Sequence, residues 1–375
     1  MATETMLSYN ASDVNLTSNE DVSSSKEDQY DDLRLVMTLI VSPTLCVFGI
    51  SGNILNVLVL SRRQMKASSD NKVESTACLG LIILAISDML YCICTLPDAF
   101  VVSKVLYEYK SFFMYYNVYS SYLRNSLSYT STWLTVLMAV SRYMAICHPL
   151  HARIFVIPGG IKLSVVVITV VWFCLTLPEA FELAVRTMVI DANQTYYVIE
   201  EGYFSTNQVF RDTFTYLWSI LGFIIPVSIL AFCNVRLIQA LRESQRMRRE
   251  YRVHQRTQQP GSKITSTLIA IVMMFLILVC PSEILNIIQK FTTYSPPGVA
   301  IARDIANVMH TLNFSVNFVL YCIVNVHFRS TLRDMFCHFC IKKSKEKRFF
   351  QASSTTLYTH VPTRSSVNHH NETKL

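Results

Sequence analysis

The sequence predicts an all-α membrane protein, a bundle of seven transmembrane helices followed by a short amphipathic helix at the membrane interface. Of the 375 residues, 51% are hydrophobic and only 16% are charged, whereas charged residues make up about 25% of an ordinary soluble domain. The apolar residues are gathered into stretches of about 20 residues or more, the length with which a helix crosses the hydrocarbon core. Basic residues are concentrated in alternate connections between these stretches.

Seven stretches have the length and composition of transmembrane helices. They cover residues 35–60, 76–97, 119–146, 161–183, 213–239, 265–288 and 300–323. The third and seventh are the most polar, as expected for helices that line an interior cavity and meet lipid over part of their surface. Residues 1–34 are polar and acidic and carry no cleavable signal sequence, so the first span is expected to act as the targeting signal.

The basic residues predict the orientation. Lys and Arg mark the cytoplasmic side, and they are concentrated after the first span, in the connection 240–262 and after the seventh span. The N-terminus is then extracellular, and we expect a multi-pass protein of the plasma membrane. Glycosylation sequons at Asn10, Asn15 and Asn193 fall on the same outer side. The net charge of +7 is therefore attributed to topology and contact with membrane lipids, and not to nucleic-acid binding.

Four segments follow from this topology. They are a glycosylated extracellular tail at 1–34, the bundle at 35–323, the amphipathic helix at 324–340 and a disordered cytoplasmic tail at 341–375. Cys337 and Cys340 close the amphipathic helix and are candidate palmitoylation sites, with plain reduced thiols as the alternative. The last segment is rich in Ser and Thr, and phosphates there would attract a basic partner. None of the eleven cysteines falls in a predicted extracellular connection, so we expect no disulfide.

Polar residues inside the spans are candidates for function, because they are costly in a bilayer. Asp88 lies at mid-span, and Ser131, Asn313 and Asn317 fall at a similar depth. One carboxylate with neutral oxygen donors is a candidate site for a sodium ion. An interhelical hydrogen-bond network with protonated Asp88 explains the same residues equally well. We expect no other cofactor.

Arg124 lies in the outer third of the third span, where a guanidinium needs a carboxylate, a carbonyl or a ligand. Glu283 and Asp98 are candidate partners, and Glu179 and Glu182 fall at a similar depth. Opposite charges that converge at one depth favour a binding pocket over a purely structural ion pair. The candidate ligand-binding residues are Arg124, Glu283, Asp98, Asn125, Ser128, His310 and Tyr122, although a histidine such as His310 is more often a packed, hydrogen-bonded group.

The chain shows no catalytic signature. It has no Gly-rich phosphate loop, no His-Glu-x-x-His and no Cys/His cluster at metal spacing, so we do not expect an enzyme. Prolines interrupt the second, fourth, fifth and sixth spans and are expected to kink those helices. These prolines are Pro97, Pro178, Pro226 and Pro281.

A series of short motifs occurs in a fixed order along the spans. The series comprises Gly52–Asn53, Leu84–Asp88, Ser141–Tyr143, Cys147–Leu150, Trp172, Pro226, Phe275 with Pro281, and Asn317–Tyr321. Over residues 35–337 this ordered set resembles the rhodopsin-like (class A) G-protein-coupled receptors. The resemblance implies that a ligand in the outer pocket favours a state in which the sixth helix swings outward. It also implies roles in G-protein coupling and activation for Arg142, Tyr143, Asn317, Tyr321, Pro281 and Phe275.

Three segments, at 112–119, 147–153 and 315–318, resemble invertebrate FMRFamide-type neuropeptide receptors. This resemblance implies an amidated peptide ligand. Glu283 or Asp98 would pair with the arginine of the peptide, and Arg124 would bind its terminal carbonyl. The implied partners are this neuropeptide, a heterotrimeric G protein, membrane lipids, and arrestin and a receptor kinase acting on the Ser/Thr tail. The alternatives are another amidated peptide, an orphan receptor with basal activity, or a seven-span transporter or channel, for which the internal symmetry is missing.

The chain departs from the class A pattern at several positions. The acid that usually precedes the arginine of the third span is Ser141, and the usual cysteine at the start of that span is Asn117. Val279, Phe318 and Asn234 replace a tryptophan, a proline and a tyrosine in the sixth, seventh and fifth spans. Because Arg142 lacks a neighbouring carboxylate, we expect a looser inactive state with measurable basal signalling.

Overall fold

The structure is a computed structural model that describes residues 32–70, 72–99, 110–155, 158–191, 194–250, 260–291, 297–335 and 337. The predictions for Asn10, Asn15, Asn193, Cys340 and the Ser/Thr-rich tail lie outside these residues. The chain divides into two compact units, Met1–Asn325 and Val326–Leu375.

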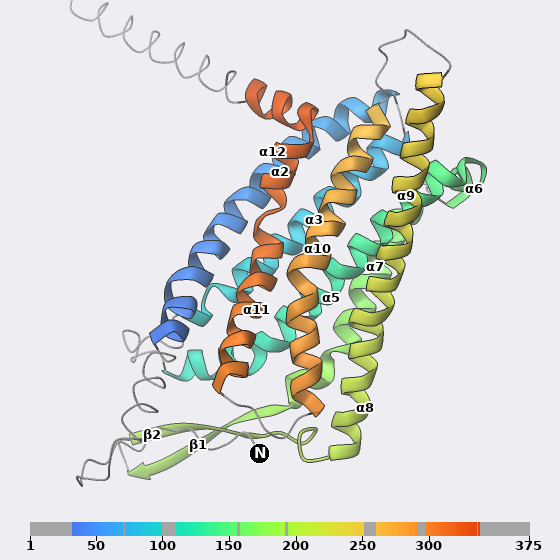
Figure 1. Ribbon diagram of the computed structural model, residues 1–375. Helices are drawn as coiled ribbons and strands as arrows, with labels where there is room; N and C mark the ends of the chain where they lie inside the picture. Colours follow the sequence, from blue (N-terminus) through green and yellow to red (C-terminus); the bar gives the residue numbers. More distant parts are fainter. Residues whose placement is uncertain are drawn as a thin grey trace, which may run out of the picture. The chain divides into compact units, whose positions relative to one another are not determined.

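The first unit is a bundle of long helices (Figure 1). Its helices are α2 (Ser42–Asp70), α3 (Lys72–Thr95), α5 (Lys110–Cys147), α6 (Pro149–Phe155), α7 (Pro158–Leu175), α8 (Gln208–Trp218), α9 (Ile225–Glu250), α10 (Pro260–Phe291), α11 (Pro297–Ser315) and α12 (Asn317–Val324). With α8 and α9 counted as one rod and α11 and α12 as another, the described residues contain a helix for each of the seven predicted spans. The predicted bundle is confirmed.

Apolar side chains cover the outside of this bundle, as a lipid environment requires. On α7, Leu163 is 65% exposed and Val166 is 58% exposed. Among the described residues, four helical stretches are long and apolar enough to cross a membrane, at Asp32–Arg62, Ser75–Thr95, Gly159–Phe181 and Gln208–Glu243. The bent pair α11–α12 passes the same test when taken together, whereas α5, the predicted polar third helix, is not among them.

Breaks in the helices fall at specific places. A π-helical segment, η1 (Met37–Val41), precedes α2, and a second one, η4 (Ser219–Ile224), joins α8 to α9 just before Pro226. Pro281 lies inside α10, as predicted. Pro97 instead follows the end of α3, and Pro178 belongs to the 3-10 helix η3 (Leu177–Phe181) that follows α7, so these two prolines end their helices.

A β-hairpin lies at one end of the bundle, and the sequence analysis did not anticipate it. Strand β1 (Leu183–Asp191) pairs with β2 (Gln194–Glu201) in antiparallel fashion, with Leu183 opposite Glu201 at the base. Both strands contact α5. We call this end of the bundle the hairpin end and the opposite end, which carries α6, the α6 end (Figure 1).

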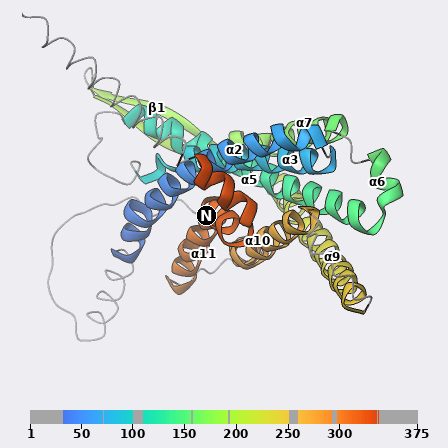
Figure 2. The same cartoon turned by 90° about the horizontal axis from the view of Figure 1, so that it is seen from above.

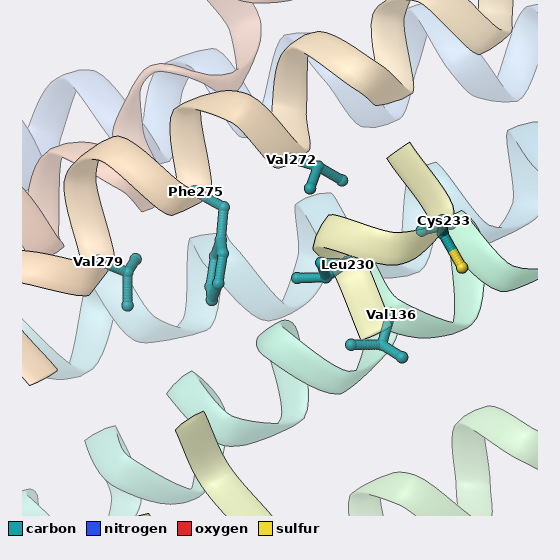
Figure 3. Close-up of a cluster of buried hydrophobic side chains, with 7 residues drawn as sticks. Val136, Leu230, Cys233, Val272, Phe275 and Val279 are labelled. Carbon is teal, nitrogen blue, oxygen red and sulfur yellow. The ribbon is translucent and has the colours of Figure 1, made fainter. Parts of the chain in front are cut away.

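The central helix of the bundle is α5. It contacts α3, α7, α9 and α10, and the view from above shows it between α3 and α7 on one side and α10 on the other (Figure 2). A buried apolar cluster joins α5, α9 and α10 through Val136, Leu230, Val272 and Phe275 (Figure 3). Because other helices surround α5, a helix that carries so many polar side chains can cross the membrane.

The second unit begins with a helix over 326–335. Arg329 and Arg333 are exposed on it, whereas Phe328 is fully buried. Cys337 is exposed and is a free thiol. The sequence predicted a helix in this segment, whereas Val326, which the same periodicity placed beside Phe328, is 49% exposed.

Candidate functional site

A cavity of about 610 Å³ lies within the bundle, and polar side chains line much of it. From α5 it is lined by Arg124, Asn125, Ser128 and Tyr129. These residues recur at intervals of three and four, so the helical repeat places them on one face. The facing side chains come from the segment that follows α3 and from η3, α10 and α11, and include Asp98, Glu179, Glu283 and His310. Six of the seven predicted ligand-binding residues therefore surround one cavity.

Arg124 is held in place by Asp98. Its Nη1 atom donates to both carboxylate oxygens of Asp98, at 2.7 and 2.6 Å, and to the Ser120 hydroxyl at 3.0 Å. Burial raises the pKa of the Asp98 carboxyl, and the Arg124 guanidinium opposes that shift. Of the two candidate partners, Asp98 forms the ion pair with Arg124, whereas Glu283 lies near His310.

Two further contacts join α5 to the cavity wall. The Asn125 amide donates to the Glu179 carboxylate at 2.8 Å. The Ser128 hydroxyl lies 3.0 Å from His310 Nε2, and His310 Nδ1 lies 3.8 Å from the Glu283 carboxylate. His310 thus links α5 to α10 as a packed, hydrogen-bonded group on the wall of the cavity.

Tyr122 lies elsewhere. Its hydroxyl donates to the Phe173 carbonyl oxygen at 3.1 Å, and its ring packs edge-on against the Phe173 ring. It is not among the residues that line the cavity. Its position on the α7 side of α5 follows from the helical repeat, because it lies two residues from Arg124.

Several lining residues were missed from the sequence. Trp218 and Asp304 line the cavity, as do Met37 and Thr38 of the π-helical segment η1. Asp304 also forms an ion pair with Arg34 at 3.4 Å. A carboxylate near the start of the seventh span was a usable signal for Asp304, whereas nothing in the sequence marks the π-helical turn that belongs to the cavity wall.

A buried polar network lies deeper in the bundle. Ser131 donates to Asp88 Oδ1 and Asn317 donates to Asp88 Oδ2, both at 2.6 Å. Asn53 donates to the Phe314 carbonyl oxygen at 2.9 Å. Within the described part of the chain, Asn313 makes no hydrogen bond to Asp88.

This network also bears on the proposed sodium site. The two Asp88 oxygens and the Ser131 hydroxyl oxygen lie together, and a hard cation prefers such ligands. Asn317 presents its amide nitrogen to Asp88, so it gives a hydrogen bond and not a further oxygen. These residues therefore provide some of the oxygen ligands that a cation needs, and they provide one hydrogen-bond donor for each Asp88 oxygen.

The seventh helix breaks beside this network. The axes of α11 and α12 differ by 53°, with Val316 between them. The break occurs although the chain has Phe318 where the class usually has proline. Gly52 allows α2 to pack closely against Phe318 at the start of α12, since a Cβ on Gly52 would lie only 2.9 Å from the Phe318 Cβ.

At the α6 end, the structure places the remaining predicted signalling residues. Arg142 is 5% exposed and Tyr321 is 1% exposed. The Ser141 hydroxyl donates to the Leu137 carbonyl oxygen of its own helix, at 2.7 Å. The Tyr143 hydroxyl lies 3.0 Å from His148 Nε2. Ser141 therefore turns back onto its helix and supplies no anion for Arg142.

Comparison with known proteins identifies the family to which this architecture belongs. The chain matches the 7 transmembrane receptor (rhodopsin family) over residues 52–325. It is 30% identical to the sex peptide receptor-related protein 2 of Caenorhabditis elegans over 357 residues, which cover 87% of this chain and 77% of that protein. It is 25% identical to the sex peptide receptor of Drosophila melanogaster over 89% of this chain and 78% of that protein.

Another relative is the FMRFamide receptor of Drosophila melanogaster, 25% identical over 76% of this chain. The chain spans about half of that protein's length, 50%. The chain belongs to the rhodopsin family of seven-transmembrane receptors. It is a class A G-protein-coupled receptor and a multi-pass membrane protein, it acts through a G protein, and it is not an enzyme.

Proposed function

We propose that this receptor binds an amidated peptide of the FMRFamide type in the cavity described above, with the hairpin end outside the plasma membrane. The named peptide receptors among its relatives support a peptide ligand. The cavity volume of about 610 Å³ accommodates the terminal residues of a short peptide. The C-terminal ends of α2 and α9 lie at the α6 end (Figure 1). Basic residues are concentrated at these points of the sequence, and the positive-inside rule favours the cytoplasm for that end.

The observation that carries the proposal is the way in which Arg124 is held. Its hydrogen bonds to Asp98 and Ser120 all use Nη1, and Tyr116 also forms a side-chain hydrogen bond with the guanidinium. Arg124 lines the cavity with 21% of its side chain exposed. A guanidinium fixed along one edge leaves donors for a carbonyl oxygen. The uncharged carbonyl of a terminal amide suits it, because Asp98 already balances the positive charge.

A cationic peptide side chain would find its partner on the other wall. Glu283 and Glu179 both line the cavity and belong to α10 and η3. Asp98 is the weaker candidate for this role, since Arg124 binds both of its oxygens. We therefore assign the peptide arginine to Glu283, and a bidentate guanidinium–carboxylate contact would give both affinity and orientation.

Calcium mobilisation tests the proposal. Cells expressing the receptor with a promiscuous G-protein α subunit would be challenged with FMRFamide and with other amidated peptides. We expect a saturable response that Arg142→Ala abolishes and that Glu283→Gln weakens by about 10-fold or more, the loss of one charged hydrogen bond. Asp212→Asn, an exposed carboxylate on α8 outside the cavity, is the matched control. No response to FMRFamide at confirmed surface expression, with a response to another amidated peptide, would replace the ligand but keep the class.

The remaining partners belong to the same proposal. Arrestin and a receptor kinase would act on the Ser/Thr-rich tail, and membrane lipids would hold the amphipathic helix through Arg329, Arg333 and palmitate on Cys337 and Cys340. The exposure of Cys337 supports its modification. Glycans on Asn10, Asn15 and Asn193 would mark the outer side. An orphan receptor that signals mainly by basal activity is the alternative that a silent peptide panel would favour.

A further inference from the structure

The β-hairpin carries no covalent link to the bundle. The sequence has no cysteine between Cys94 and Cys147, or between Cys174 and Cys233, so neither the hairpin nor the hairpin end of α5 can supply a disulfide. A two-stranded hairpin by itself is only marginally stable in water. Noncovalent contacts must therefore hold β1 and β2 at the end of the bundle, and those with α5 are one part of them.

Aromatic rings close the base of the hairpin. Phe181 lies two residues before β1 and Phe204 lies three residues after β2, and their ring centroids are 5.9 Å apart. The backbone closes at the same point, where the Gly202 N–H donates to the Glu182 carbonyl oxygen at 2.7 Å. A Cβ on Gly202 would meet the Phe181 carbonyl oxygen, so only glycine permits this approach.

From Phe204 the aromatic contacts continue along α8. The ring centroids of Phe204 and Phe210 are 4.8 Å apart, those of Phe210 and Phe214 are 4.3 Å apart, and those of Phe214 and Trp218 are 5.4 Å apart. Residues 210, 214 and 218 follow one another at intervals of four, so they share one face of the helix. Asn207 caps the start of α8 by accepting from the Phe210 N–H at 3.1 Å, which fixes the first of these rings.

The series of rings ends at the wall of the cavity. Trp218 lines the cavity, and its indole Nε1 donates to the Leu175 carbonyl oxygen at the end of α7, at 3.1 Å. The π-helical segment η4 begins at the next residue, Ser219, which also lines the cavity. The ring contacts therefore connect the hairpin base to the cavity wall along one face of α8.

We propose that this ring line, defined as Phe181, Phe204, Phe210, Phe214 and Trp218, is the noncovalent tether that holds the hairpin base to the cavity wall at Trp218 and slows the escape of the ligand. Three of the four successive ring pairs are tilted and the Phe214–Trp218 pair is edge-to-face, and together four such contacts approach the free energy of one disulfide. These residues are positioning residues, because four of the five do not line the cavity and act through Trp218. The ligand role rests on the proposed function, whereas the tether does not.

Hydrogen exchange tests the tether without any ligand. The full-length receptor would be purified in lipid nanodiscs, and exchange in peptides spanning 183–204 would be followed by mass spectrometry. We expect Phe210→Leu to accelerate this exchange about 3- to 10-fold, the loss of one or two ring contacts. Phe210→Tyr keeps the ring and should restore the wild-type rate. Tyr216→Leu, on the same helix but outside the ring line, is the matched control.

The outcomes are distinct. Equal exchange in wild type and Phe210→Leu would overturn the tether. So would equal acceleration by Tyr216→Leu, because it would reflect general loosening of α8. If Phe210→Leu does not fold, Phe214→Leu is tested in the same way. Dithiothreitol should leave the wild-type exchange unchanged.

A ligand measurement then tests the role in binding. Labelled FMRFamide should dissociate several-fold faster from Phe210→Leu than from wild type, with surface expression and basal signalling unchanged. Equal dissociation rates, with faster hairpin exchange, would overturn the ligand role and leave the tether. If FMRFamide does not bind the wild type, the proposed ligand fails, and the exchange experiment still decides on the tether.

Discussion

Arg124 and Asp98 form an ion pair in which one nitrogen, Nη1, lies 2.6 Å from Oδ2 and 2.7 Å from Oδ1 of the carboxylate. The pair joins the middle of α5 to the segment that follows α3. Its side chains are 21% and 33% exposed, so the cavity and not bulk solvent surrounds them. This contact decides which of the acidic groups in the cavity is available to a cationic ligand.

A double-mutant cycle on this pair is the first prediction. Arg124→Gln and Asp98→Asn should each lower thermal stability and peptide potency, because each leaves a partly buried charge without its partner. The double variant should recover most of the stability, with a coupling free energy of about 1 kcal/mol, since the pair is partly exposed. It should not recover potency, because the guanidinium that binds the peptide carbonyl is absent. Thermal unfolding and calcium responses of the four proteins check both statements, and full recovery of potency would exclude Arg124 as a ligand contact.

The sequence predicted the bundle and most of the cavity because both depend on periodic patterns. Apolar stretches of membrane length define the helices, and the helical repeat places Arg124, Asn125 and Ser128 on one face. It did not predict which acid pairs with Arg124, because a position within a span fixes depth only to about one helical turn. Nor did it predict the hairpin, because strand preference depends more on the surrounding packing than helix preference does.

The Asp88 network gives the second prediction. Ser131→Ala and Asn317→Ala each remove a donor at 2.6 Å from a buried carboxyl group. Each should lower the free energy of unfolding by about 1–3 kcal/mol, the cost of a buried polar group left without a partner. Thermal unfolding in sodium chloride and in choline chloride separates the two interpretations of the cluster. Equal losses in both salts indicate the hydrogen-bond network, and a loss confined to sodium chloride indicates a bound cation.

Close packing at Gly222 gives the third prediction. A Cβ at this position would lie 2.5 Å from the Tyr129 ring, and that ring is itself stacked on Trp172 with centroids 4.7 Å apart. Gly222→Ala should therefore cost about 1–3 kcal/mol of stability and lower peptide potency, because the displaced ring lines the cavity. Gly159→Ala is the matched control, since nothing lies within 4 Å of its Cβ. Thermal unfolding and calcium responses should show Gly159→Ala unchanged, and equal behaviour of the two variants would contradict the packing argument.

The environment of Arg142 gives the last prediction. The residue before Arg142 is Ser141, which has no carboxylate, and its hydroxyl donates to the Leu137 carbonyl oxygen. An adjacent carboxylate would favour the charged, buried arginine of the inactive state by about 1–2 kcal/mol, which corresponds to about a 5- to 30-fold change in the population of the active state. Wild-type receptor should therefore raise basal second-messenger output above that of untransfected cells, and Ser141→Asp should lower it. Ser141→Asn, similar in size to Asp but uncharged, controls for the shape of the side chain. Basal output equal to that of untransfected cells at matched surface expression would refute the looser inactive state, whereas equal effects of Asp and Asn would place its cause in packing and not in charge.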